Sequence, residues 1–275
     1  MTCRFFRYLA LLSFGFTSFA LAKGAQGEAL PAFHSHNDYE RKRPLWDALE
    51  AGVRSVEADV WGFWDGLFVR HWPFFGKSGP FESWYFWPMF EFKEREPSLT
   101  WDYLWIDIKG PEDRLRQQLL LKLNSSLSKA KAGQKPPEII LSGRGRVKRD
   151  IASEWVKRDP SHTFPVWHDA HDWKADDLPW GGEADPWLWY SLNWPERYTW
   201  RGQGCLPAAE WKRWQTEVAQ IHLKKRKVRY FHVPQTQEWV RAAHQIGVDL
   251  IDLDDLALAT ERGVNSEKRT QMCPE

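Results

Sequence analysis

The chain has 275 residues, of which 43% are hydrophobic and 27% charged, and its formal net charge at pH 7 is +1. These proportions are those of an ordinary globular protein, and the length suits one (β/α) barrel. The balanced charge argues against a nucleic-acid partner, which would require a basic surface. No feature of the sequence indicates a protein partner.

The first 22 residues have the pattern of a cleavable signal peptide. Two arginines precede an apolar run over residues 9–21, and Ala20-Leu21-Ala22 provides a small-x-small cleavage site. The run is too short, and too often interrupted by serine and glycine, to favour an uncleaved membrane anchor. We therefore predict a signal peptide over residues 1–22, a single domain over residues 23–275, and a secreted or periplasmic protein.

Removal of the signal peptide would leave two cysteines, Cys205 and Cys273. In an oxidising compartment they can form a disulfide that ties the C-terminal tail to the body of the protein. Their positions in the sequence are equally compatible with two separate thiols.

Short β-type segments alternate with helical segments from residue 30 onward. The predicted strands cover residues 30–36, 55–61, 103–109, 138–142, 163–168, 187–194, 228–233 and 249–254. The predicted helices cover residues 44–51, 112–130, 147–155, 207–225 and 236–246. This alternation predicts a parallel sheet, either doubly wound or closed, and eight strands favour a (β/α)8 TIM-type barrel.

Residues 72–98 do not fit the alternation. They are rich in aromatic residues, proline and glycine, and we predict a long loop over the mouth of the barrel. The aromatic part, residues 74–92, is compatible with contact to a lipid surface and equally with core or lid packing. A transient contact with a membrane surface is therefore one expectation.

Polar residues recur two positions apart at the ends of the first three predicted strands. Residues at this spacing on a strand face the same way. The three pairs are His34 and His36, Glu57 and Asp59, and Asp107 and Lys109. Because functional residues of a barrel gather at the C-terminal ends of its strands, we expect the three pairs to converge.

Three converging carboxylates indicate a metal site. Burying them without a counter-charge costs several kcal/mol per ion, and Lys109 offsets only part of that cost. A divalent cation resolves the problem, and oxygen ligands suit Mg²⁺ or Ca²⁺. His71 follows a β-like segment and places another imidazole beside the cation, as general acid–base cleavage of a phosphodiester requires. Taken singly, a strand histidine or an Asp107–Lys109 pair is also explained by packing.

The stretch HSHNDYERKRPLWDALEAGVRSVEADVW, followed by LFVRH and LWIDIKG, resembles the glycerophosphodiester phosphodiesterase and phospholipase C-like superfamily. The similarity is closest to the branch of the altered-inheritance-of-mitochondria-6 proteins. It continues more softly through EIILSGRGR, YTWRGQG, VRYFHVPQTQEWV and GVDLIDLDDL. The resemblance implies a barrel phosphodiesterase that uses a divalent cation.

Residue by residue, the resemblance implies a ligand set and a catalytic histidine. The metal ligands of the family fall on Glu57, Asp59 and Asp107, with Lys109 behind them, and the second catalytic histidine falls on His71. Asp107 stands in place of the commoner glutamate and is one methylene shorter. Another departure is a tryptophan directly after His71, where many relatives have an aspartate, so the group that orients this imidazole is left open.

The resemblance leaves the first catalytic histidine ambiguous. The first imidazole of the strand is His34, whereas the His-Asn-x-Tyr pattern of phosphatidylinositol-specific phospholipases C selects His36. The second alignment also makes Asn37 an additional metal ligand, and this pattern match favours His36.

Further residues near predicted strand ends are candidates for substrate binding. Arg144 can grip a phosphate bidentately, as can Arg146, although solvated loop residues explain them too. Asn193 and His232 follow later strands and complete, with Lys109, the predicted substrate contacts. We predict that residues 168–172 form a loop at the mouth.

The sequence thus predicts a metal-dependent phosphoric diester hydrolase acting on glycerophosphodiester-like or phospholipid-like substrates, by hydrolysis or by transfer through a cyclic product. Two alternatives stay open. The 19 tryptophans suit a glycoside hydrolase, which needs two carboxylates but no cation or histidine pair. A non-catalytic sugar- or lipid-binding barrel is the other.

Overall fold

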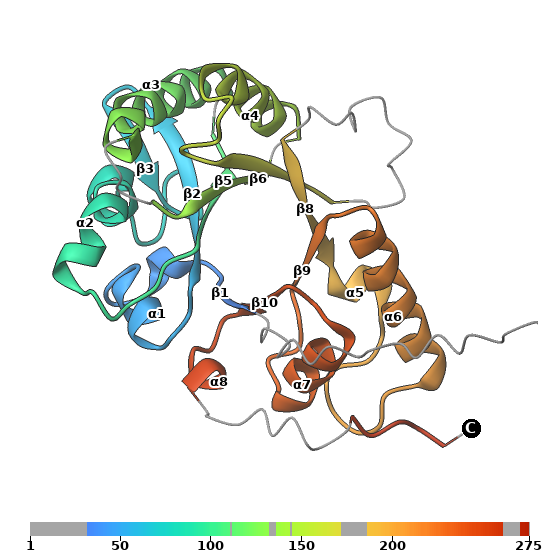
Figure 1. The fold of residues 1–275 in the computed structure, drawn as a ribbon. Helices are drawn as coiled ribbons and strands as arrows, with labels where there is room; N and C mark the ends of the chain where they lie inside the picture. Colours follow the sequence, from blue (N-terminus) through green and yellow to red (C-terminus); the bar gives the residue numbers. More distant parts are fainter. Residues whose placement is uncertain are drawn as a thin grey trace, which may run out of the picture. The chain divides into compact units, whose positions relative to one another are not determined.

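The computed structural model describes residues 32–110, 112–131, 136–143, 145–171, 186–260 and 270–274. The predicted signal peptide and the candidate Arg144 lie outside the described residues. Within them, eight parallel strands form a closed barrel (Figure 1). The strands are β1 (Ala32–Ser35), β2 (Ser55–Phe63), β5 (Tyr103–Ile108), β6 (Glu138–Gly143), β7 (Val166–Ala170), β8 (Trp187–Asn193), β9 (Lys227–Phe231) and β10 (Leu250–Leu253). The predicted TIM-type barrel is confirmed.

The barrel closes where its first strand meets its last. β1 pairs in parallel with β2 on one side and with β10 on the other, and His34 lies opposite Asp252 in the register with β10. The remaining barrel strands follow one another in chain order from β2 and β5 to β10. Each of the eight strands predicted from the sequence corresponds to one strand of the barrel.

Alternation along the strands separates an outer apolar layer from a mixed interior. On β5, Leu104 and Ile106 belong to the apolar layer, whereas Trp105 belongs to a separate small cluster with Trp189 and residues of two other strands. The rings of Trp105 and Trp189 meet edge to face with centroids 5.4 Å apart. Both strand faces are buried because helices cover the outside and side chains fill the inside.

All five predicted helices are present (Figure 1). They are α1 (Trp46–Glu50), α3 (Glu112–Lys131), α4 (Gly145–Arg158), α6 (Ala208–Leu223) and α7 (Gln237–Ile246). The ends of α7 show why the sequence predicts them well. Thr236 caps the first turn by accepting a hydrogen bond from the Trp239 amide, and Gly247 ends the helix at φ 86°. Shorter helical elements are η1 (Asp38–Glu40), α5 (Trp194–Arg197) and α8 (Ala257–Thr260).

Residues 72–98 depart from the predicted long loop. After β3 (Gly66–Val69), which pairs antiparallel with β2, residues 70–78 form a loop, as do residues 96–98 at the end of the segment. The chain then forms β4 (Gly79–Pro80), the π-helix η2 (Glu82–Phe86) and α2 (Pro88–Arg95). Phe81, Tyr85 and Met89 are buried at a four-residue spacing, which is the core-facing pattern of a helix. Pro88 occupies the first turn of α2, where proline favours helix formation.

The C-terminal tail is attached to the barrel by a disulfide between Cys205 and Cys273. Beside it, Leu206 and Met272 form a short parallel bridge. The two cysteines are therefore paired, which resolves the alternative that their spacing left open. None of the helices among the described residues is both long and apolar enough to cross a membrane.

Candidate active site

Three carboxylates meet at the C-terminal end of β2 and β5. Glu57 and Asp59 project from β2 into the barrel, and Asp59 lies opposite Asp107 in the register with β5. Oxygen atoms of the three side chains lie within 4.8 Å of one another. The convergence follows from the two-residue spacing on β2 and from the alignment of neighbouring parallel strands.

Two oxygens of this cluster are buried without a hydrogen-bond partner, Asp59 Oδ1 and Asp107 Oδ1. The second oxygen of each aspartate has a partner: Tyr39 donates its hydroxyl to Asp59 Oδ2 at 3.0 Å, and Lys109 Nζ lies 2.5 Å from Asp107 Oδ2. Unpartnered buried carboxylate oxygens are costly. As members of an all-oxygen cluster, Asp59 and Asp107 fit a divalent cation such as Mg²⁺ or Ca²⁺.

The cluster holds more negative charge than its neighbours neutralise. Burial, together with the charge of Glu57, raises the pKa of Asp59 to about 8. The same two causes raise the pKa of Asp107. Lys109 opposes both shifts but does not cancel them. A bound cation would stabilise the ionised carboxylates, and this is the second observation that fits a metal site.

A buried cationic network lies beneath the carboxylates. Arg229 on β9 donates to Glu57 Oε2 and to Asp252 Oδ1, both at 3.0 Å. Although burial favours the neutral acid, the Arg229 guanidinium holds the pKa of Glu57 well below its usual range. Glu57 is therefore an ionised ligand candidate held in one orientation.

His34 belongs to this network and not to the mouth. It is fully buried, and its Nε2 lies 3.3 Å from Glu57 Oε2 while its Nδ1 lies 2.8 Å from Ser55 Oγ. Burial, together with the charge of Arg229, lowers the pKa of His34. In this position His34 can orient Glu57 but does not face a substrate at the mouth.

His36 is the partly exposed imidazole at the end of β1. Its Nδ1 lies 2.7 Å from Asp254 Oδ1. Although burial opposes protonation, this hydrogen bond raises the pKa of His36 to about 9. A cavity of about 270 Å³ is lined by His36, Asn37, Glu40, Arg41 and Asp254. Of the two candidates for the first catalytic histidine, His36 has the access that proton transfer requires.

Tyr39 links Asn37 and His71 to the carboxylates. Its hydroxyl lies 2.9 Å from Asn37 Oδ1, 3.0 Å from Asp59 Oδ2 and 3.2 Å from His71 Nδ1. The predicted extra ligand Asn37 is thus joined to the cluster through a shared hydroxyl.

His71 reaches the cluster because β3 folds back along β2. The Arg70 amide donates to the Asp59 carbonyl at 3.0 Å, which places the next residue beside the Asp59 side chain. His71 Nδ1 lies 3.0 Å from Asp59 Oδ2. Asp59 therefore orients this imidazole, in place of the aspartate that the sequence lacks after His71.

The predicted substrate contacts are found in three different settings. Lys109 lies in the carboxylate cluster. Asn193 Oδ1 lies 3.3 Å from His232 Nδ1, and the His232 ring is 6.4 Å from the His36 ring, so this pair borders the mouth. Arg146 is largely exposed on α4 and pairs with Asp150 at 3.5 Å.

The prediction of a mouth loop over residues 168–172 is wrong for residues 168–170, whereas His171 lies in a bend directly after β7 and is exposed. His168 and Asp169 belong to β7 and are buried. Asp169 accepts from Ser142 Oγ at 2.9 Å and from Lys148 Nζ at 2.5 Å. These are interior contacts of the barrel wall, and Asp172 lies outside the described residues.

Sequence reasoning missed Arg229, Asp252 and Tyr39. A charged residue inside the apolar strand at residues 227–231 was the available signal for Arg229, because an interior strand position tolerates a cation only beside a partner. The partner was not identifiable, since Glu57 lies 172 positions away in the chain.

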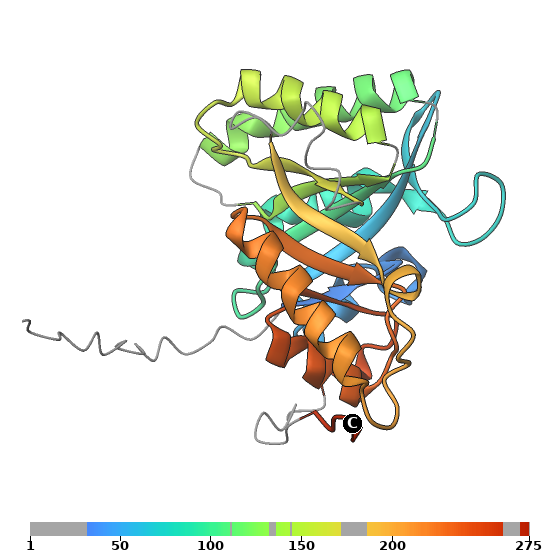
Figure 2. The ribbon, with the colours of Figure 1, turned by 90° about the vertical axis from the view of Figure 1, so that its right-hand side faces the viewer.

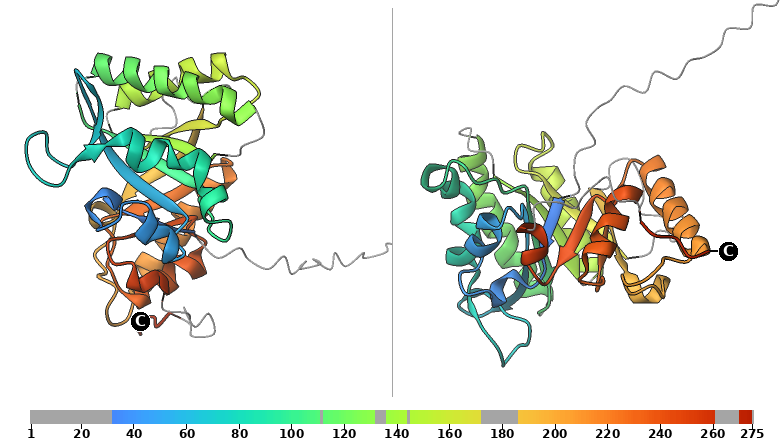
Figure 3. Two further views of the ribbon diagram at one scale, coloured as in Figure 1. Left: turned by 90° about the vertical axis from the view of Figure 1, so that its left-hand side faces the viewer. Right: turned by 90° about the horizontal axis from the view of Figure 1, so that it is seen from below.

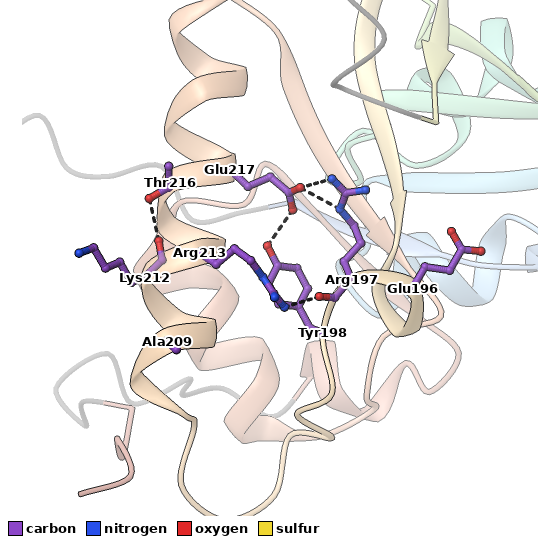
Figure 4. A pocket seen from close by; sticks show the side chains of 8 residues that line it. All are labelled: Glu196, Arg197, Tyr198, Ala209, Lys212, Arg213, Thr216 and Glu217. Carbon is purple, nitrogen blue, oxygen red and sulfur yellow. Dashed lines mark hydrogen bonds and ion pairs between the residues drawn. The ribbon is translucent and has the colours of Figure 1, made fainter. Parts of the chain in front are cut away.

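A second hollow, of about 580 Å³, lies between α5 and α6 (Figure 4). Its lining shares no residue with the carboxylate cluster. Glu217 points into it and is bonded by Arg197 and by the Tyr198 hydroxyl, as the dashed lines in Figure 4 indicate. Tyr230 also donates to Glu217 at 2.6 Å. The charge of Glu217 in this hollow is thus neutralised by Arg197 within the protein.

The fold and the site define a class: a (β/α)8 barrel whose mouth carries a carboxylate cluster flanked by imidazoles. Residues 27–120 match the family model of the AIM6-like phosphodiesterase domain. The resemblance predicted from the sequence is therefore confirmed over the segment that supplies β1, β2, β5 and the candidate histidines His34, His36 and His71.

Known relatives match over a shorter stretch. Altered inheritance of mitochondria protein 6 from Kluyveromyces lactis is 66% identical over 32 residues, which are 12% of this chain and 8% of that protein. The same-named protein from Eremothecium gossypii is also 66% identical over 32 residues, with the same coverage. The matched stretch is thus a small part of these relatives.

Two solved structures share the fold. A glycerophosphodiester phosphodiesterase from Parabacteroides distasonis superposes with a TM-score of 0.55 at 13% identity, covering 86% of this chain and 97% of that one. A putative glycerophosphoryl diester phosphodiesterase from Silicibacter pomeroyi gives a TM-score of 0.51 at 13% identity, covering 84% and 92%. At this identity the likeness concerns the barrel alone.

Proposed function

We propose that the protein is a metal-dependent phosphoric diester hydrolase whose substrates are glycerophosphodiester-like or phospholipid-like molecules. The observation that carries the proposal is the pair of unpartnered oxygens on Asp59 and Asp107, buried between carboxylates and beside His71. The phosphodiesterase family match over residues 27–120 supports the same reaction class.

The cation would be held by Glu57, Asp59 and Asp107, with Asn37 as a further oxygen donor. When bound, it would supply positive charge to the non-bridging oxygens of the phosphate. Mg²⁺ and Ca²⁺ both suit these ligands.

The two partly exposed imidazoles would move the protons of the reaction. One of His36 and His71 accepts the proton of the attacking hydroxyl, and the other donates a proton to the leaving alkoxide. Asp254 orients His36 and Asp59 orients His71. Lys109 places a further positive charge beside the carboxylates, where it can also meet a phosphate oxygen.

We further propose that the protein is exported. The signal-peptide pattern of residues 1–22 motivates this proposal, and the Cys205–Cys273 disulfide is compatible with an oxidising compartment.

The proposed function is tested by assaying the purified protein against soluble phosphodiesters, including glycerophosphocholine and bis(nitrophenyl) phosphate, with and without EDTA. We expect hydrolysis that EDTA abolishes and that Mg²⁺ or Ca²⁺ restores. EDTA-resistant hydrolysis of glycosides in place of phosphodiesters would favour a glycosidase.

A further inference from the structure

The loop between β3 and β4 carries three exposed aromatic side chains. Trp72 is 61% exposed, Phe74 79% and Phe75 75%. Figures 2 and 3 show this loop, in teal, standing out from the body of the barrel. Large apolar side chains that are exposed together mark a surface that contacts something else.

The loop is held in its extended position by its own base. Arg70 donates from Nε to Ser78 Oγ at 2.9 Å and from Nη1 to the Pro73 carbonyl at 2.7 Å. β3 and β4 pair on either side of the loop. Lys77 donates to the Arg41 carbonyl and lies 5.2 Å from the Trp84 ring. The phenylalanines are therefore presented to solvent by a hairpin whose base is held by hydrogen bonds.

The loop starts at the candidate active site. Trp72 directly follows His71, and their ring centroids are 4.8 Å apart. His71 in turn contacts Asp59 in the carboxylate cluster. A surface held by the tip of this loop would consequently lie beside the mouth.

The shape and charge of the loop favour a lipid surface over a protein. A stable protein partner requires a broad, complementary area, whereas a bilayer accepts a narrow convex tip. Aromatic side chains partition to the boundary between headgroups and acyl chains. Lys77 at the base of the loop is exposed. Lys42 is also exposed, and it directly follows Arg41, whose carbonyl accepts a hydrogen bond from Lys77. These cations complement anionic headgroups.

We propose that residues 72–78 form a membrane-contact loop that inserts Phe74 and Phe75 into the surface of an anionic phospholipid bilayer. The contact would hold the mouth against the headgroups. The membrane contact does not depend on the proposed function. The further step, that the substrates are lipid headgroups held in the bilayer, rests on that function.

The test compares vesicle binding of three forms of the protein without the predicted signal peptide, that is, residues 23–275. Large vesicles of phosphatidylcholine and phosphatidylserine in equal amounts are sedimented with the parent protein, with F74S/F75S, and with W64S. Trp64 is 87% exposed but lies in the turn between β2 and β3, so its replacement is the matched control. Trp72 is kept because it contacts His71.

We expect the parent and W64S to sediment with the vesicles and F74S/F75S to bind at least about tenfold more weakly. Hydrolysis of a soluble phosphodiester by F74S/F75S should equal that of the parent. Equal vesicle binding by all three forms, or no binding by the parent, would overturn the membrane contact. Selective vesicle binding without hydrolysis of any phosphodiester would leave the contact standing and refute the proposed function.

Discussion

Arg229 and Glu57 form a buried ion pair across the interior of the barrel, with Arg229 Nη2 donating to Glu57 Oε2 at 3.0 Å. Their strands, β9 and β2, are separated in the sheet by β10 and β1. The Arg229 guanidinium also lies over the Trp105 ring, 4.6 Å from its centroid. Through this pair, the interior cluster that contains Trp105 is connected to the candidate metal ligand Glu57.

Replacing Arg229 should weaken both the fold and the cation site. Arg229→Met would leave Glu57 and Asp252 as uncompensated buried acids, which costs about 3–5 kcal/mol of unfolding free energy. Urea denaturation measures this loss. Arg229→Lys keeps the charge but cannot reach both acids in the same way, so it should unfold less easily than Arg229→Met while binding Mg²⁺ more weakly than the parent by calorimetry. An unfolding free energy unchanged in Arg229→Met would contradict this role.

Asp59→Asn should abolish cation binding while stabilising the cation-free protein. The pKa of Asp59 is raised from 3.8 to about 8. Folding therefore takes up a proton at this carboxyl, and stability contributed by the group is full below pH 3.8 and declines as the pH rises to about 8. The amide of the Asp59→Asn variant stays neutral at every pH, so the variant avoids the cost of ionising a buried carboxyl near neutral pH.

Two measurements test this prediction. Calorimetry with Mg²⁺ and Ca²⁺ should show binding to the parent and none to Asp59→Asn. Thermal unfolding in EDTA should show that the parent loses stability between pH 4 and pH 8 more steeply than the variant. Retained cation affinity in the variant would refute the site itself.

His71→Ala should lower the rate of phosphodiester hydrolysis by about 10²–10⁴-fold, the usual contribution of a general acid or base. If His71 is the acid, the loss should be smaller for a nitrophenyl diester, whose leaving group needs little protonation. The comparison of glycerophosphocholine with the nitrophenyl diester measures this difference. An equal loss on both substrates would assign proton donation to His36.

Lys148→Met should destabilise the barrel wall without affecting cation binding. Lys148 and Asp169 are both buried, and removal of the lysine takes away the buried counter-charge of Asp169 at a cost of about 3–5 kcal/mol. Denaturant unfolding and Mg²⁺ calorimetry separate the two effects. Weaker cation binding at unchanged stability would contradict the prediction.

The same pair should shape the acid limb of the stability curve. Although burial opposes ionisation, Lys148 lowers the pKa of Asp169 from 3.8 to about 2. This lowered pKa contributes roughly 2 kcal/mol of stability above pH 3.8, lost as the pH falls through about 2. Asp169→Asn should accordingly flatten the acid-induced loss of stability. A parent and variant that lose stability in parallel would show that the charge of Asp169 is unimportant.

The strands and the carboxylate cluster were predictable because both follow from local spacing. Two-residue alternation puts Glu57 and Asp59 on one face, and parallel neighbours align Asp59 with Asp107. His36 was favoured over His34 by a motif, and their different burial agrees with that preference.

Other features depend on contacts that no local pattern contains. Arg229 finds Glu57 only once the barrel has closed. Residues 79–95 read as a loop because of Pro80 and Pro88, yet Pro88 begins a helix whose buried side chains pack on the barrel. The pairing of Cys205 with Cys273 likewise depends on the folded position of the C-terminal tail, because the two cysteines are 68 positions apart in the sequence.

The pairing of β1 with β10 has a consequence for the timing of assembly. His34 lies beside Asp252 in that register, and Asp252 holds the guanidinium that steadies Glu57. A nascent chain that ends before residue 249 contains every candidate ligand but lacks β10 and therefore Asp252, which holds Arg229 in place. A competent cation centre should therefore arise only after β10 has docked against β1, so that a strand late in the barrel completes a site whose candidate ligands lie mainly on β2 and β5.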